Sequence, residues 1–459
     1  MKLQNDLGRD NITSLVIKLA VPTMIAQFVN VLYSIVDRMY IGNIPQIGEL
    51  ALAGVGVCGP IVTLLSSFAT LIGLGGAPIM AMRLGQENRA GARTILSNAF
   101  GMLLILSVAL PVVFFLFMDK LLLLFGASAT TLVYAHDYMV VYAMGTVFAL
   151  LATGLNSFII CQGFSTVAMG TVLIGAVCNI VLDPIFIFTF HMGVRGAAIA
   201  TVISQAASCL FVVCFLLAKS TPVRITFGGY SWSIVKNIVK FGFCPFIIIA
   251  TDSVLLIVMN MALKKYGGGQ ADLLIASGTI VQSFLLLVTM PLGGITGGTQ
   301  PILSYNYGAQ NTGRIRQGIK TILIMALVFN ALMLVLSRVV SGFFAGIFTS
   351  DPDNIALSVW AIKVTTLGII PMAIQYTIVD ALTAIGVTRV AVTLSLLRKS
   401  TYFLTTLVAP LWFGATSVFF AQPVADCLSS VISMITFGLI FNRIMAERDA
   451  MPADSKLFE

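Results

Sequence analysis

Residues 169–190 read "MGTVLIGAVCNIVLDPIFIFTF" and contain one charged residue, Asp183. A helix of this length crosses the hydrocarbon core of a bilayer, which is roughly 30 Å thick. An ionised carboxylate at that depth is costly, so an acid in a membrane helix marks an ion or substrate pathway by default. The stretch therefore predicts a membrane-spanning helix that carries a functional carboxyl group, with Pro184 directly behind it.

Comparable apolar stretches recur along the whole chain. Of the 459 residues, 58% are hydrophobic and 10% are charged, and the mean hydropathy is +1.00. Soluble domains carry roughly 25% charged residues, so a soluble globular protein is excluded. About 12 stretches are long enough to span a membrane, and all must be helices because lipid leaves an open strand without hydrogen-bond partners. The predicted spans are 15–41, 51–80, 94–118, 133–158, 165–190, 196–218, 238–262, 272–300, 318–346, 356–383, 391–412 and 416–442.

Basic residues lie mainly in alternate connections. The net charge is +8. If the N-terminus is cytoplasmic, about 19 of the 26 Lys and Arg residues lie on the cytoplasmic side, as the positive-inside rule requires. This predicts a multi-pass protein of the cell membrane, the plasma or inner membrane, with both termini in the cytoplasm. The basic balance is thus an orientation signal, and we expect no nucleic-acid partner.

The chain contains an internal duplication. The segment "GGAPIMAMRLGQENRAGARTI" at 75–95 matches "GGTQPILSYNYGAQNTGRIRQGI" at 297–319, and the two prolines, Pro78 and Pro301, are 223 residues apart. The same offset relates Pro22 to Pro245 and Gly163 to Gly386. We therefore predict an all-α membrane protein of two six-helix units, 1–225 and 226–459. Six is even, so both units enter the membrane from the same side and are related by a pseudo-two-fold axis along the membrane normal, as in some secondary transporters.

Polar residues gather on two helices of the first unit. Gln27, Asn30, Ser34 and Asp37 follow one another at helical spacing and form a single stripe. On the fifth predicted helix Asn179 and Asp183 lie one turn apart, and Thr201 follows on the sixth.

The two acids of this unit predict a cation-coupling site. Two buried carboxylates close together cannot both stay ionised cheaply, so a proton or Na+ should neutralise the pair. Two structural alternatives remain. Asp183 can be satisfied by backbone groups at the proline kink, and Asp37 can form an ion pair with Arg38 near the helix end.

The second unit is chemically different. The equivalent of Asp37 is Asn260, and no Asn-Asp-Pro segment recurs. Its own intramembrane acids, Asp252 and Asp380, are equally consistent with a salt bridge and with a second cation or substrate site, whereas Asp426 is expected to be a structural contact. Arg398 and Lys399 are available to neutralise one of these acids. The residues grouped as a substrate site or second cation site are Gln27, Asn30, Ser34, Asp252, Asn260 and Asp380.

Several classes of chemistry leave no signature. The sequence has no G-x-x-x-x-G-K-[ST] phosphate loop, no H-E-x-x-H motif and no recognisable nucleophile constellation, so we predict neither ATP hydrolysis nor an enzyme. The seven cysteines lie in apolar segments without a C-x-x-C pair, and there are two histidines, so neither a disulfide framework nor a metal cluster is expected. We expect no cofactor besides the coupling ion, and a monomer.

Five ordered motifs carry a family resemblance over both halves. They are "VPTMIAQFVNVLYSIVDRMYIG" at 21–42, "GGAPIMAMRLGQEN" at 75–88, "NIVLDP" at 179–184, "GVRGAAIATVISQ" at 193–205 and "TQPILSYNYGAQN" at 299–311. Together they resemble the multidrug and toxic compound extrusion (MATE) family of the MOP superfamily. The resemblance implies a V-shaped pair of six-helix bundles and cation-driven export of amphipathic, often cationic, drug-like compounds. It also implies a first-unit cation site, for H+ or Na+, at Asp37, Asn179, Asp183 and Thr201, and places Asp252 near the acid that the seventh helix supplies in some relatives.

The hypothesis is therefore a secondary active multidrug efflux antiporter. Cation binding at Asp37 and Asp183 should rearrange the helices around Pro22 and Pro184 and weaken substrate binding. One rival is a lipid or lipid-linked oligosaccharide flippase of the same superfamily, which needs a cationic groove for its headgroup. A membrane-embedded enzyme and a non-transporting receptor or channel are the rivals of other classes. Membrane lipid and small-molecule substrates are the expected partners.

Overall fold

The computed structural model describes residues 5–125, 127–128, 130–219 and 221–452, and the regular structure in these ranges is helical. The first unit consists of α1 (Ile12–Gly42), α2 (Gly48–Gly85), α3 (Arg89–Leu124), α4 (Leu132–Ile160), α5 (Ser165–Pro184), the π-helix η1 (Ile185–Thr189) and α6 (Gly193–Leu217). The second unit consists of α7 (Trp232–Tyr266), η2 (Gly268–Gln270), α8 (Ala271–Gly308), α9 (Thr312–Val339), α10 (Ser341–Phe348), α11 (Pro352–Thr365), η3 (Thr366–Gly368), α12 (Ile369–Ala384), α13 (Thr388–Phe413), η4 (Ala415–Phe420) and α14 (Ala421–Ala450).

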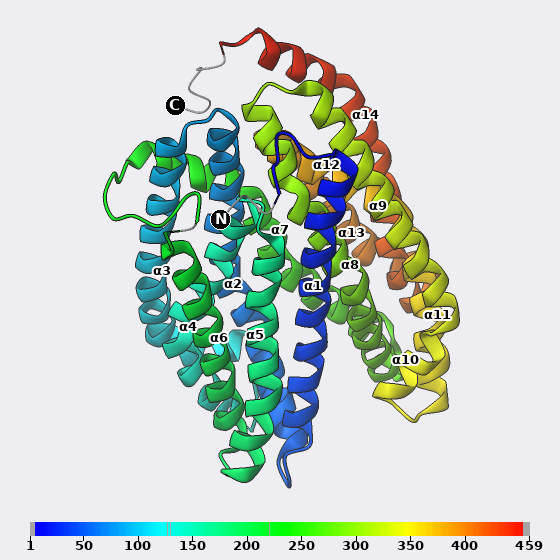
Figure 1. Cartoon of the computed structure of the whole chain (residues 1–459). Coiled ribbons are helices and arrows are strands. Elements are labelled where there is room, and N and C mark those ends of the chain that lie inside the picture. Colours follow the sequence, from blue (N-terminus) through cyan, green and yellow to red (C-terminus); the bar gives the residue numbers. More distant parts are fainter. Residues whose placement is uncertain (1–4, 126, 129, 220, 453–459) are drawn as a thin grey trace.

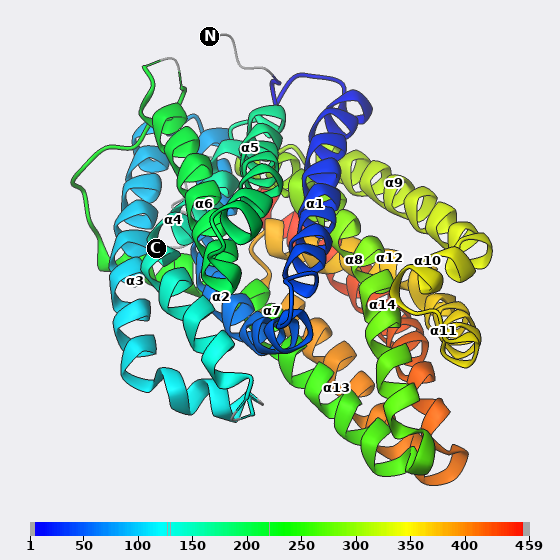
Figure 2. The ribbon, with the colours of Figure 1, turned by 90° about the horizontal axis from the view of Figure 1, so that it is seen from below.

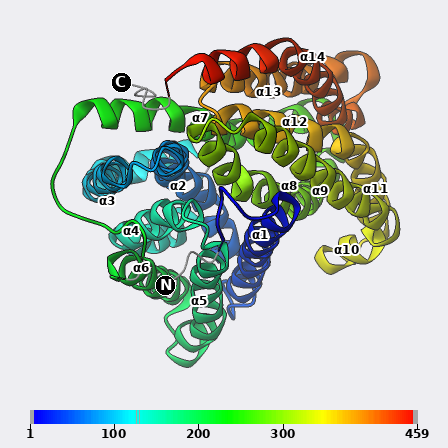
Figure 3. The same cartoon turned by 45° about the horizontal axis from the view of Figure 1, so that its top comes forward.

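The predicted twelve-helix architecture is confirmed. Within the described ranges, eleven helical runs are long and apolar enough to cross a membrane, and α11, η3 and α12 together form one of them. The twelfth, α13, is less apolar because Arg398 and Lys399 lie in its middle, but it runs beside α14 and packs against α7 (Figure 3). The prediction missed four departures from regular α-helix: the π-helix after Pro184, the break between α9 and α10, the turn η3, and the 3-10 helix η4 at the start of the last predicted span.

The two units form separate groups of helices, as Figure 2 shows. They meet through their first two helices, since α2 packs against α7 and α8 and α1 packs against α8. Helix α1 begins and α14 ends at the same end of the molecule, the top of Figure 1, which we call the terminal end.

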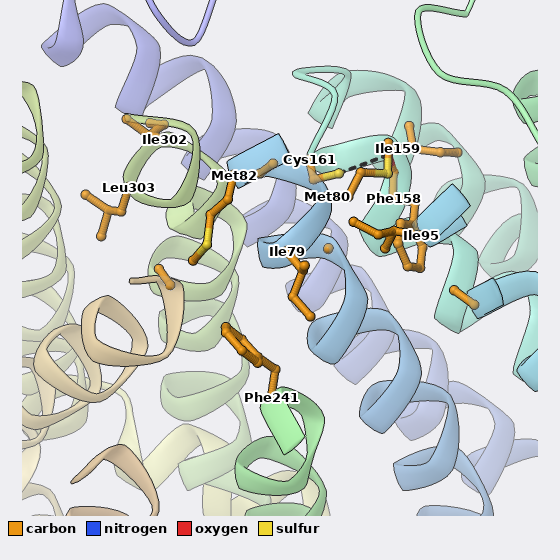
Figure 4. Close-up of a cluster of buried hydrophobic side chains, with 14 of the residues drawn as sticks. Ile79, Met80, Met82, Ile95, Phe158, Ile159, Cys161, Phe241, Ile302 and Leu303 are labelled. Carbon is orange, nitrogen blue, oxygen red and sulfur yellow. Dashed lines mark hydrogen bonds between the residues drawn. The ribbon is translucent and has the colours of Figure 1, made fainter. Parts of the chain in front are cut away.

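The packing is continuous between the units at the terminal end and divided at the other end. One core there joins both units, with Met82 from α2, Phe241 from α7 and Ile302 from α8 (Figure 4). Away from the terminal end each unit has its own core, around Ile41 in the first unit and Met259 in the second. The two groups of ribbons accordingly converge at the top of Figure 1 and diverge toward the bottom.

Glycines allow the close approach at the terminal end, and they do so symmetrically. A Cβ atom on Gly85 would lie 2.0 Å from the carbonyl oxygen of Tyr305, and a Cβ atom on Gly308 would lie 2.1 Å from that of Met82. Both pairs are equivalent under the 223-residue offset, since Gly85 corresponds to Gly308 and Met82 to Tyr305. The backbones of α2 and α8 therefore touch around the pseudo-two-fold axis, where any larger residue would collide.

Candidate cation-binding site

Helix α5 ends in a change from α-helix to π-helix directly beside the site. Pro184 has no backbone N–H and cannot continue the α-helical hydrogen bonds. The chain continues as the π-helix η1, in which the N–H of Phe190 donates to the carbonyl of Ile185 at 2.9 Å. Asp183, directly before Pro184, has a fully buried side chain at 0% exposure.

The four residues predicted for cation coupling come together. The side-chain nitrogen of Asn179 donates to Asp183 Oδ1 at 3.1 Å and to the Thr201 hydroxyl oxygen at 3.4 Å. Helix α1 packs against α5 and brings the Asp37 carboxyl close enough to the Asp183 carboxyl for a hydrogen bond between them. Asn179 and Thr201 are also buried. Three helices thus supply two carboxyl groups, an amide and a hydroxyl to one place.

Several oxygens of this cluster have neither a hydrogen-bond donor nor an ion-pair partner. Asp37 Oδ1, Asp183 Oδ2 and Asn179 Oδ1 are buried and have no hydrogen-bond partner. Among the ion pairs of the described residues, none involves Asp37 or Asp183, so Arg38 forms no ion pair with its neighbour. Two carboxylates without a counter-charge repel each other, and a shared proton or a small cation between them relieves the repulsion. The unsatisfied oxygens suit a hard monovalent cation, because such ions prefer oxygen ligands.

Three tyrosines around the acids were not predicted. Tyr33 on α1 has electrostatic contact with both Asp37 and Asp183, and Tyr138 on α4 has contact with Asp37. The Tyr138 and Tyr142 rings are stacked, with centroids 6.1 Å apart. Their hydroxyl groups bring hydrogen-bond donors near the two acids. A signal existed in the sequence: Tyr33 precedes Asp37 by four residues, and Tyr138 precedes Tyr142 by four, so each pair shares a helix face.

The rest of the α1 stripe continues from the acids toward the terminal end. Asn30 donates to Gln27 Oε1 at 3.3 Å, and Gln27, Asn30 and Ser34 are half-buried. Farther along, α1 passes through Pro22 as one continuous helix. There the Thr23 hydroxyl donates to the carbonyl of Gly294 on α8 at 2.6 Å. Pro22 therefore lies where α1 crosses the second unit.

The acids of the second unit have different partners from those of the first. Asp252 pairs with Lys399, and Asp426 pairs with Arg398 at 2.6 Å. Asp380 instead accepts a hydrogen bond from the Gln300 side chain at 3.0 Å. Both cations in the middle of α13, Arg398 and Lys399, are thus used in ion pairs.

The position equivalent to the first-unit cluster is neutral in the second unit. Asn260 and Thr406, which correspond to Asp37 and Asp183, each have a buried side-chain oxygen without a partner. Tyr402 corresponds to Asn179 and lines a cavity of about 10 Å³ with Gln282 and Gln422. The second unit therefore has buried polar residues at the equivalent positions, but no carboxyl groups there.

Three comparisons with known proteins identify the family and the fold. The MatE family model matches residues 22–185 and 246–408, once in each unit. The multidrug export protein MepA of Staphylococcus haemolyticus (strain JCSC1435) is 25% identical over 94% of this chain and 94% of its own length. MepA of Staphylococcus aureus (strain MSSA476) is also 25% identical, over 93% and 94%.

Solved structures share the fold. A crystal structure of MATE in complex with MaL6 superposes with a TM-score of 0.89 at 21% identity, covering 96% of this chain and 98% of that one. The outward-facing conformation of a multidrug resistance MATE family transporter of the MOP superfamily gives 0.88 at 21% identity and the same coverage. Since the family model covers both units and most of the sequence, the chain belongs to the MatE family, the multidrug and toxic compound extrusion family of membrane transporters.

Proposed function

We propose that the protein is a secondary active multidrug efflux antiporter that exports amphipathic, often cationic, compounds in exchange for H+ or Na+. One observation carries the proposal: the carboxyl groups of Asp37 and Asp183 lie together, each with a buried oxygen that has no hydrogen-bond partner, and neither forms an ion pair. The relatives named MepA are multidrug export proteins, which supports the substrate class. The protein acts as a monomer in the plasma membrane, with both termini in the cytoplasm.

The cycle uses competition between cation and substrate. Without a bound cation the two carboxylates repel, and a cationic substrate near the α1 stripe is favoured. A proton or Na+ that binds at Asp37, Asn179, Asp183 and Thr201 removes that charge, draws α1 toward α5 and bends the helices at Pro22 and Pro184. Substrate then leaves outward, and the inward return carries the ion. When the exchange moves one net charge inward across about 100 mV, it gains roughly 2.3 kcal/mol, which is about a fifty-fold bias. Exchange of a monovalent cationic substrate for one proton uses the concentration gradients alone.

The flippase alternative requires free positive charge for an anionic headgroup. Arg398 and Lys399 are the basic residues in the middle of α13, and both are neutralised by acids of neighbouring helices. A paired Arg398 has little attraction left for a phosphate group. The antiporter is therefore the better-supported function.

The test is dye efflux from proteoliposomes with a pH gradient and a Na+ gradient imposed separately. We expect dye to move against its own gradient when the coupling cation runs down its gradient, and to stop when an ionophore collapses that gradient. Because a receptor or an enzyme would move no dye under either gradient, that result would refute the proposal. The gradient that drives efflux identifies the ion.

A further inference from the structure

A carboxyl group outside the first-unit cluster lies at the boundary between the units. Asp380 on α12 accepts a hydrogen bond from Gln300 Nε2 at 3.0 Å, and the Thr296 hydroxyl also faces it. It lines a cavity of about 30 Å³ whose other walls include Leu74 of α2, in the first unit, and Cys244 of α7. A space of this size holds about one water molecule.

Asp380 has no counter-charge among the described residues. Arg398 and Lys399, in the middle of the adjacent α13, are paired with Asp426 and Asp252, and Arg389 at the start of α13 is exposed. The titratable group that faces Asp380 from α7 is the thiol of Cys244. One turn away on α12, Tyr376 lies against the Arg398 guanidinium, 5.2 Å from its ring centre. An ionised Asp380 would therefore depend on the amide of Gln300 and one hydroxyl for its stabilisation.

The internal repeat shows that packing does not require an acid at this position. Residue 157 is the equivalent of Asp380, and it is serine. Ser157 faces Gly73, which corresponds to Thr296, so the same helix contact exists in both units. The first unit makes this contact with a small hydroxyl group and leaves out the carboxyl group. The acid in the second unit therefore has another role.

We propose that Asp380 is a second proton-binding site, separate from the Asp37–Asp183 cluster and enclosed by the contact between the two units. A proton from hydronium forms an O–H bond on the carboxylate and cancels a charge that the surrounding groups compensate poorly. Leu74 belongs to the other unit, so separation of the units at the terminal end opens this wall and lets the proton exchange with the cytoplasm. The proposal rests on the antiport function only for this direction of exchange.

Infrared spectroscopy of purified protein tests the site independently of transport. In an Asp37→Asn/Asp183→Asn background, which removes the first cluster, we expect a carboxylic acid C=O band at neutral pH that shifts in D2O. Adding Asp380→Asn should remove the band, and so should Asp380→Ser, which installs the first-unit residue and keeps the proposal testable if the amide variant does not fold.

The matched control is Asp353→Asn, an exposed acid at the start of α11, which should leave the band unchanged. A spectrum that is the same with and without Asp380 would overturn the proposal and leave the antiport function standing. Absence of dye efflux by the parent protein would overturn the antiport function and leave the proton-binding site at Asp380 standing.

A second, independent observation concerns the segment before α1. The side chain of Asn5 donates to the carbonyl of Gly163 in the first unit at 2.9 Å. In the second unit, Arg314 on α9 donates to the carbonyls of Leu7 at 3.1 Å and Asp10 at 2.8 Å. We call residues 5–11 the first strap. It is held by the first unit at both ends, at Gly163 and through α1, and by the second unit in between.

The segment before α7 also links the two units. It leads into the second unit and is bonded to the first. The hydroxyl of Ser97 on α3 donates to the carbonyl of Thr226 at 2.5 Å, and the side chain of Asn98 donates to that of Gly229 at 3.1 Å. The N–H of Ser231 in turn donates to Asn98 Oδ1 at 2.9 Å. Residues 226–231, the second strap, thus lead into the second unit and are bonded to the first. Helices α3 and α9 are equivalent in the repeat, so the two straps bond to equivalent helices, although through residues that do not correspond.

We infer that the two straps hold the terminal end closed and must release before the units separate there. Arg314→Ala removes the two bonds that Arg314 donates to the first strap and leaves the bond from the Asn306 side chain to the carbonyl of Leu7 at 3.0 Å, so it should favour the separated state by about five-fold or more. Asn5→Ala, which removes one bond, should have a smaller effect in the same direction and serves if Arg314→Ala does not fold.

Double electron–electron resonance between spin labels at the exposed positions 90 and 317 measures the separation, with the exposed Cys214 and Cys427 replaced by serine. The matched control is Arg316→Ala on the same helix, because Arg316 is bonded within the second unit, to Asn442 at 3.0 Å. We expect a longer-distance population in Arg314→Ala and none in Arg316→Ala. Identical distance distributions in Arg314→Ala and the parent would refute the inference.

Discussion

Asp183→Asn is expected to abolish cation-driven efflux while the protein stays folded in the membrane. The amide keeps the size and the contact with Asn179 but neither binds a proton nor balances Na+. Efflux under an imposed pH or Na+ gradient should fall to the background rate of liposomes without protein. Asp37→Asn should behave alike, because the two carboxyl groups act as one pair. Initial rates of dye efflux from proteoliposomes measure both.

A matched acid-to-amide change distinguishes this loss from a general effect of charge removal. Asp119 on α3 has a side chain that is 67% exposed and lies outside the cluster. Asp119→Asn should transport at the parent rate. Unimpaired transport by both Asp183→Asn and Asp37→Asn would contradict the assignment of the coupling site.

Gly308→Ala should have the second large effect, on the contact between the units. The added methyl group would lie 2.1 Å from the carbonyl oxygen of Met82, a backbone atom that has no room to rotate away. Forcing an atom into such a contact typically lowers stability by about 1–3 kcal/mol. We expect a loss near the upper end of this range, because the nearest atoms are all backbone atoms of Met82. Thermal unfolding of the purified protein should show the loss, and the units should separate more readily at the terminal end.

The control lies on the same helix. A Cβ atom on Gly297 would have no neighbour within 4 Å, so Gly297→Ala should be neutral or slightly stabilising, since alanine favours the helix. Equal melting temperatures for Gly308→Ala and Gly297→Ala would show that α2 and α8 do not approach as closely as described.

The sequence predicts the fold well because its signals are local or repeated. Long apolar runs dictate helices in lipid, and the offset of 223 residues shows the duplication without any structure. The first-unit residues could be selected in the same way, since the spacing of Asn179 and Asp183 places them on one helix face. Their meeting with Asp37 could not be derived from spacing, because it depends on how α1 packs against α5.

The second unit shows where local patterns lose information. Asp252, Asp380 and Asp426 are similar as sequence signals, each an acid in an apolar helix. Two of them pair with the adjacent residues Arg398 and Lys399 on α13, and the third does not. The choice among them is made by the rotation and tilt of α13 against α7 and α14, which no sequence period encodes. The π-helix after Pro184 is similar: proline predicts an interruption but not its form.

The central claim is that the Asp37–Asp183 pair binds a small cation in competition with substrate. It is tested most directly by adding substrate to purified, detergent-solubilised protein in weakly buffered solution and recording released protons with a pH dye, with radioactive sodium binding measured in parallel. The account predicts release of about one cation for each substrate bound, and none in Asp37→Asn/Asp183→Asn. Substrate binding by the parent protein without release of either ion would contradict it.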